Sequence, residues 1–186
     1  MSYFRDTYNR NEKTNGVIID IALDDQLNFY HEWDNVKFKN RDVNPDLADF
    51  LEKYVKQIPS KENLEIKFYI NNNRDSDAEY GIIESFKHYY GMEIRAVKKD
   101  MLYMYMFTVA NFMLFLLLNS VYFYVGENFG DGLVAYTLEI GFELGLWIFL
   151  WQAFYTIVFD RTGEKRKMKL YRRLLDAEIS FAGESK

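Results

Sequence analysis

Two long apolar stretches constrain this chain more than any other feature. From Met101 to Val125 the sequence runs for 25 residues without a charged side chain, which exceeds the roughly 20 residues that an α-helix needs to cross a bilayer core. From Gly132 to Phe159 a second stretch of 28 residues has only two charges, Glu139 and Glu143, and contains Tyr and Trp of the kind that gather at membrane interfaces. The sequence therefore predicts two transmembrane helices, 101–125 and 132–159.

The charges around these spans predict their orientation. The connector 126–131 is short and its only charges are acidic, whereas Lys and Arg precede the first span and follow the second. Under the positive-inside rule both long tails are cytoplasmic and the connector is external, as in a multi-pass protein of the cell membrane, the inner one in a bacterium. The basic residues after the second span are expected to attract anionic lipid head groups of the bilayer: Lys165, Arg166, Lys167, Lys169, Arg172 and Arg173.

The segment 1–100 has the pattern of a small α/β domain. Val17–Leu23 (VIIDIAL) and Leu64–Ile70 (LEIKFYI) are typical of strands. Between them Asn44-Pro45 predicts the start of a helix that ends before Pro59, and a further helix is expected to begin near Asp75 or Asp77 and run into the first span. The order β-α-β-α predicts a parallel, right-handed crossover.

A sheet of two strands leaves exposed edges that need cover. The sequence offers two candidates: a second copy of the chain, or the tail Glu178–Phe181, which alternates apolar and polar residues. The tail would be reached through a basic helix, so the segment 160–186 is expected to be a cytoplasmic helix and tail.

Composition excludes several classes of protein. The chain has no cysteine, which excludes disulfides, thiolate catalysis and Cys-ligated metals. Its formal net charge of -5 opposes a nucleic-acid partner, because no basic surface dominates the part outside the spans.

The end of the chain carries a resemblance. The stretch GLWIFLWQAFYTIVFDRTGEKRKMKLYRRLLDAEISF (145–181) resembles an uncharacterised family of small two-span bacterial proteins in which a cytosolic α/β domain precedes the hairpin, with weaker similarity between Asn44 and Ile70. The shared pattern is an apolar span, an Asp, a basic stretch and a short final strand. This chain departs from the pattern at 161–163, where Arg-Thr-Gly stands in place of the usual aromatic residues. The resemblance implies an architecture and no activity.

The polar residues within the spans are the first set of candidate functional residues. Helical geometry predicts one stripe with Glu139 and Glu143, and a nearly opposite stripe with Gly141, Gly145 and Gln152. The Gly-x-x-x-Gly spacing permits close approach of another helix. The first span has polar groups at comparable depths, namely Thr108, Asn111 and Asn119.

Three interpretations of these polar groups are open. Two helices alone cannot shield them all from lipid, which favours a homo-oligomer with a glutamate-lined interior. A proton-coupled site is the second interpretation. The third is that Glu139 lies at the outer interface with Glu143 about one turn deeper.

The long loop 24–44 holds the second set of candidates. Ligands of open α/β sheets gather at the carboxyl ends of strands, where this loop places charged side chains: Asp24, Asp25, His31, Asp34, Arg41 and Asp42. No metal-ligand spacing, phosphate loop or catalytic set is present, so we expect no cofactor, no metal and no enzymatic activity, and solvated loop charge is the simpler interpretation.

Three functional hypotheses follow. The first is an oligomeric membrane protein whose cytoplasmic domain senses a ligand or partner and is coupled to a bundle that conducts ions or disrupts the membrane. The second is a membrane-anchored adaptor that recruits a cytosolic protein. The third is an enzyme acting at the membrane surface.

Overall fold

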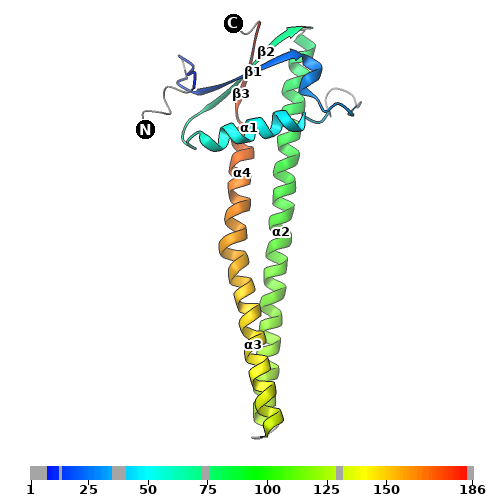
Figure 1. The fold of residues 1–186 in the computed structure, drawn as a ribbon, viewed down its shortest axis with the longest axis vertical. Coiled ribbons are helices and arrows are strands. Elements are labelled where there is room, and N and C mark those ends of the chain that lie inside the picture. The colour runs from blue at the N-terminus through cyan, green and yellow to red at the C-terminus, as the bar shows by residue number, and fades with distance from the viewer. Residues whose placement is uncertain (1–7, 13, 35–40, 73–75, 129–131, 184–186) are drawn as a thin grey trace. The chain divides into compact units, whose positions relative to one another are not determined.

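The computed structural model describes residues 8–12, 14–34, 41–72, 76–128 and 132–183, which fall into two compact units (Figure 1). The sheet unit is Met1–Arg95 together with Met168–Lys186, and the hairpin unit is Ala96–Lys167. The end of the chain thus belongs to the same unit as its beginning.

The sheet has three parallel strands in the order β1-β2-β3. They are β1 (Val17–Asp25), β2 (Leu64–Asn72) and β3 (Glu178–Ala182). Both predicted strands are confirmed, as is their parallel pairing. The chain's own tail forms the third strand, and its Ile179 and Phe181 lie beside Ile66 and Phe68 of β2. The tail therefore covers an edge for which a second copy was the other candidate.

Helix α1 (Pro45–Gln57) is specified by its ends. The side chain of Asn44 accepts a hydrogen bond from the backbone N–H of Asp46 at 2.9 Å, and Pro45 stands at the first helical position, where no N–H is needed. The helix stops before Pro59, as predicted. Its Leu51 and Val55 are fully buried against the sheet.

One face of the sheet carries the core. Along β1, buried residues alternate with more exposed ones, so that Ile19 and Ile21 point inward and Asp20 points outward. The inward face packs against side chains from α1, α2 and α4, including Phe86 and Leu174, which are fully buried. Helices from distant parts of the sequence therefore share one apolar layer.

The hairpin unit is made from two long helical runs. Helix α2 (Ser76–Asn128) is a single helix of 53 residues, which confirms the predicted continuation into the first apolar stretch. Helix α3 (Leu133–Tyr155) leads through a π turn, η3 (Thr156–Asp160), into α4 (Arg161–Leu175). Within the hairpin unit α2 and α3 run antiparallel (Figure 1).

The less exposed side chains of the hairpin recur at heptad spacing. This repeat is typical of a left-handed helix pair. The repeat consists of Met101, Met104, Thr108, Asn111, Phe115, Leu118 and Tyr122 on α2, and of Ala135, Glu139, Phe142, Leu146, Phe149, Ala153 and Thr156 on α3 and η3. Asn119 and Gly145 are also half-buried, each next to a position of the repeat. After Thr156 the next half-buried position is Arg161, five residues on, so the π turn absorbs a one-residue shift in the repeat.

Outside this seam the hairpin is apolar and exposed. Both helical runs are long and apolar enough to cross a membrane, and only 6% of the residues in the apolar window of each are buried. Large side chains such as Phe107, Leu117 and Ile148 are more than half exposed. The core helix of a globular domain would bury most of these residues. The fold is mixed α/β, with a small parallel sheet and two long apolar helices.

Candidate functional site

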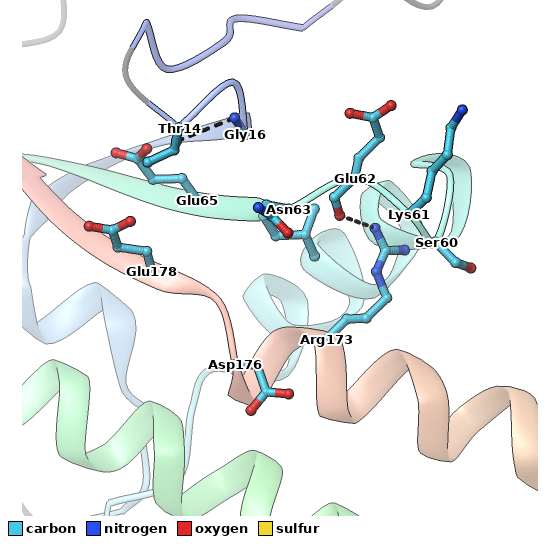
Figure 2. A pocket seen from close by; sticks show the side chains of 11 residues that line it. Thr14, Gly16, Ser60, Lys61, Glu62, Asn63, Glu65, Arg173, Asp176 and Glu178 are labelled. Carbon is cyan, nitrogen blue, oxygen red and sulfur yellow. Dashed lines mark hydrogen bonds between the residues drawn. The ribbon is translucent and has the colours of Figure 1, made fainter.

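A cavity of about 360 Å³ lies at the amino ends of the three parallel strands. Its wall comes from the segment before β1, the loop between α1 and β2, the starts of β2 and β3, and the end of α4 (Figure 2). The amino ends of the strands are opposite to their carboxyl ends, at which the sequence predicted a ligand site. No local sequence pattern marks this cavity, because its wall combines three stretches that are distant in the sequence, 14–16, 60–65 and 173–178.

The cavity wall has four acidic and two basic side chains, and part of its negative charge is compensated locally. Glu65 and Glu178 are register neighbours on adjacent parallel strands, so their side chains share one face. The buried Glu65 carboxylate accepts hydrogen bonds from the Ser180 hydroxyl at 3.0 Å and from the Asn11 amide. Two carboxylates side by side are destabilising unless such donors offset their repulsion.

Arg173 of α4 forms part of the cavity wall. Its Nη1 donates to the carbonyl oxygens of Val55 at 3.2 Å and Ile58 at 2.9 Å, and its Nη2 donates to those of Pro59 at 3.0 Å and Glu62 at 3.3 Å. Figure 2 shows the Glu62 contact. Burial lowers the pKa of the Arg173 guanidinium below its ordinary value. The sequence grouped Arg173 with lipid-contacting residues, but in the structure it joins α4 to the end of α1.

Apart from Asp24, the predicted ligand residues of the loop 24–44 contact other residues of the same loop. Asp24 is exposed near the end of β1, and the Asp25 carboxylate accepts from the backbone N–H of Leu27 at 2.8 Å, which caps the short helix η1 (Gln26–Phe29). Residues 35–40 lie outside the described part of the chain.

The rest of this loop is tied together in the same way. The Asp34 carboxylate accepts from the backbone N–H of Asp42 at 2.7 Å, and His31 donates its backbone N–H to the Asp42 carbonyl at 3.0 Å. The Arg41 guanidinium lies 5.4 Å from the ring centre of Tyr30. In the described part of the chain no three His, Asp or Glu side chains are arranged to hold a metal ion.

A cluster of tyrosines between α1, α2 and α4 was not anticipated. Tyr90 of α2 is fully buried between Tyr89 and Tyr171, with ring centres at 5.1 and 6.0 Å. Burial, together with nearby Glu93 and Glu52, raises the pKa of Tyr89 to about 12, and burial is also the largest cause that raises the pKa of Tyr171. Tyrosine is common in this sequence, so composition could not single out these three.

In the hairpin, two pairs of neighbouring residues on the two helical runs define two levels, and we call the part between them, where most exposed side chains are apolar, the apolar layer. The guanidinium of Arg161 lies 6.0 Å from the ring centre of Tyr105. At the other end, a Cβ placed on Gly126 would lie 3.6 Å from Oε1 of Glu139. Tyr105 and Gly126 are 21 positions apart, which corresponds to about 31 Å of helix, and Glu139 and Arg161 are 22 positions apart, which gives about 32 Å including the π turn. The two helices thus delimit a layer of the same thickness.

The other polar residues of the hairpin differ in how far they are buried. Thr108 and Asn111 face the seam, and each donates to the carbonyl oxygen four residues earlier on its own helix, at 2.9 and 2.8 Å. Asn119 is half-buried, whereas Gln152 is exposed. Glu143 is exposed as well, four residues inside the layer from Glu139. The predicted glutamate stripe is therefore divided between the seam and the outer surface.

The Gly-x-x-x-Gly pattern is not used for packing within the described chain. A Cβ added at Gly141 or Gly145 would meet no atom within 4 Å. Both positions are open, so any close helix contact there would need a second molecule.

The basic residues of α4 are mostly exposed. Lys165, Arg166, Lys169 and Arg172 are exposed, and Lys167 pairs with Glu164 at 2.9 Å. Arg173 alone among them is bound to the α1 segment as described above.

No protein-family model, curated protein or solved structure matches this chain. These comparisons neither support nor oppose the resemblance to small two-span bacterial proteins.

Proposed function

We propose that this chain is an integral membrane protein in which the hairpin crosses the bilayer and the sheet unit lies in the cytosol. The observation that carries the proposal is the apolar layer of the hairpin. Its thickness of about 31 Å agrees with the roughly 30 Å of a bilayer hydrocarbon core. It is also bounded by a Tyr–Arg contact at one end and a carboxylate at the other.

The exposure of the hairpin supports the same conclusion. An aqueous protein would pay about 25 cal/mol for each Å² of apolar surface left in water. Exposed apolar side chains along two whole helices are the usual lipid-facing surface of a membrane hairpin. Orientation follows from charge, because basic residues flank the Tyr105–Arg161 end and Glu127 lies beyond the Gly126–Glu139 end.

The absence of cysteine makes topology directly testable. Single variants Glu127→Cys, Leu116→Cys and Lys169→Cys would be exposed to a membrane-impermeant maleimide on intact bacterial cells expressing the full chain. We expect labelling of Glu127→Cys on intact cells, of Lys169→Cys only after lysis, and none of Leu116→Cys without detergent. Labelling of Leu116→Cys at the rate of an exposed residue would overturn the membrane assignment, and the reverse pattern at the other two sites would overturn the orientation.

We further propose that the sheet unit senses a ligand or partner and transmits its state to the hairpin. Two features support this. Helix α2 has no break between residues of the sheet unit and residues of the hairpin unit, and the chain that leaves α3 continues through α4 to form β3. The cavity at the strand amino ends, with the α4 residue Arg173 in its wall, is the candidate ligand site.

We propose that the sheet unit controls an oligomeric bundle of hairpins, which conducts ions or disrupts the membrane. Glu143 supports it, because a carboxylate exposed within the layer has no shielding from its own chain. Liposomes containing the protein would be tested for ion flux against empty liposomes, with and without cell extract. Flux equal to that of empty liposomes under both conditions would exclude this function.

A membrane-anchored adaptor is the second candidate. The hydrogen bonds of Thr108 and Asn111 to their own helix favour it, because a hairpin with internally satisfied polar groups can serve as a simple anchor. Glu143→Gln combined with Asn119→Leu separates the two candidates: an anchor should keep its cellular function, whereas a conducting bundle should lose it.

A further inference from the structure

Five basic residues lie at one level of the hairpin unit. Because Tyr105 and Arg161 are neighbours on antiparallel helices, equal steps outward from this pair reach the same level on both helices. Lys98 and Lys99 are seven and six positions from Tyr105, and residues 165–167 are four to six positions from Arg161. All five side chains therefore begin about 6–10 Å outside the apolar layer. We call Lys98, Lys99, Lys165, Arg166 and Lys167 the basic belt.

Most of the positive charge of the belt is available to an external partner. Lys167 is paired with Glu164, and Lys99 lies over the ring of Tyr103 at 5.8 Å. Lys98, Lys165 and Arg166 are exposed, and no ion pair joins any of them to an acid in the described ranges. Two acids accompany the five basic residues: Asp100 is exposed five positions from Tyr105, and Glu164 is the partner of Lys167. The net charge at this level is therefore still positive, and cations at the same height on two adjacent helices repel one another unless a further anion lies beside them.

We propose that the basic belt binds the phosphate groups of anionic glycerophospholipids in the cytosolic leaflet. This inference rests on the proposed membrane location. A bilayer of about 40–45 Å has an apolar core of about 30 Å, which leaves about 5–7 Å of head-group layer on each side. Lys and Arg side chains just beyond that layer reach back into it while their apolar stems lie along the helix. The chemistry selects a phosphate diester with net negative charge over a zwitterionic head group, whose own ammonium would be repelled.

The binding can be measured with the chain's own tryptophans. Trp147 and Trp151 lie on the exposed surface of α3, so a bilayer lipid with brominated acyl chains will quench them when it lies against the hairpin. Full-length protein would be reconstituted into vesicles of phosphatidylcholine and phosphatidylglycerol, with bromine on one lipid or on the other, at low and high salt. The belt variant replaces Lys98, Lys165 and Arg166 with Gln. The control variant removes the same charge from the sheet unit, with Lys53, Lys56 and Lys87 replaced by Gln, all three exposed and outside the cavity wall.

We expect brominated phosphatidylglycerol to be preferred at least about fivefold at low salt, since each basic residue near the surface contributes about 1 kcal/mol. The preference should fall to near one in the belt variant, persist in the control variant, and weaken at high salt. Equal quenching by both lipids in the unmodified protein would overturn the inference while leaving the membrane location intact. The same holds if the belt variant prefers phosphatidylglycerol as strongly as the unmodified protein does. Loss of preference in the control variant would also overturn it. Absence of quenching by either lipid would instead refute the proposed membrane location.

Discussion

Arg173 offers the sharpest test of how the tail is held in the sheet unit. Replacing it with Ala removes four hydrogen bonds from a charged donor to the carbonyl oxygens of Val55, Ile58, Pro59 and Glu62. Hydrogen bonds to charged groups contribute about 1.5–3 kcal/mol each when buried. The side chain is half-exposed and the bonds are not additive, so we expect a total loss of about 3 kcal/mol.

Two further variants separate charge from geometry. Arg173→Lys keeps the charge, but one ammonium group cannot match a planar guanidinium at four acceptors, so about half of the loss should remain. Arg172→Ala removes an identical side chain at the preceding, exposed position. That variant should change stability by less than about 0.5 kcal/mol.

Hydrogen–deuterium exchange of the full chain in nanodiscs is the appropriate assay, because it reports opening segment by segment. The loss predicted for Arg173→Ala corresponds to about 100-fold faster exchange in β3 and in the segment that follows α1. The apolar segments of α2 and α3 should not change. If Arg173→Ala and Arg172→Ala exchange at the same rate, the four carbonyl contacts do not stabilise the tail and this reasoning is refuted.

Three further predictions concern the sheet unit. Asn44→Ala should destabilise α1 by about 1 kcal/mol, measurable as faster exchange in its first turn, because the cap at Asp46 is lost. Leu174→Ala should cost about 2–5 kcal/mol as a core truncation, whereas Leu116→Ala on the exposed hairpin surface should cost far less, and equal shifts in thermal melting would contradict this contrast. Since the pKa of Tyr89 is raised from 10.0 to about 12 in the folded chain, its contribution to stability is complete below pH 10 and is lost as pH rises toward 12, so Tyr89→Phe should flatten the alkaline fall in melting temperature.

Local sequence patterns predicted much of the fold. The β-branched run at the start of β1, the alternation in β2 and the Asn44-Pro45 start of α1 each specify an element through nearest-neighbour physics, and each element is present. The alternation of Ile179 and Phe181 marked the tail as a candidate strand. Whether that strand would pair with its own chain could not be settled, because the pairing depends on segments more than 100 residues apart.

The candidate sites were less predictable. The charges of the loop 24–44 predicted a ligand site, yet the carboxylates of Asp25 and Asp34 cap and close the loop, with Asp42 contributing its backbone N–H and carbonyl. The cavity at the amino ends of the strands could not be foreseen, since its wall combines the segment before β1 with the distant residues Glu65 and Glu178. The position of Glu139 beside Gly126 of the other helix likewise depends on the packing of the hairpin.

The sequence by itself determined the two apolar helical runs, the parallel α/β pattern, the charge asymmetry around the hairpin and the absence of thiol chemistry. These are properties of composition and of spacing within one helix or strand, which local sterics and hydrophobicity decide. Only the tertiary structure decided that Arg173 holds the end of α1 and that Glu139 and Glu143 have different surroundings. It also brought five basic residues of two helices to one level. Each of these depends on long-range packing, which brings together residues that no local pattern connects.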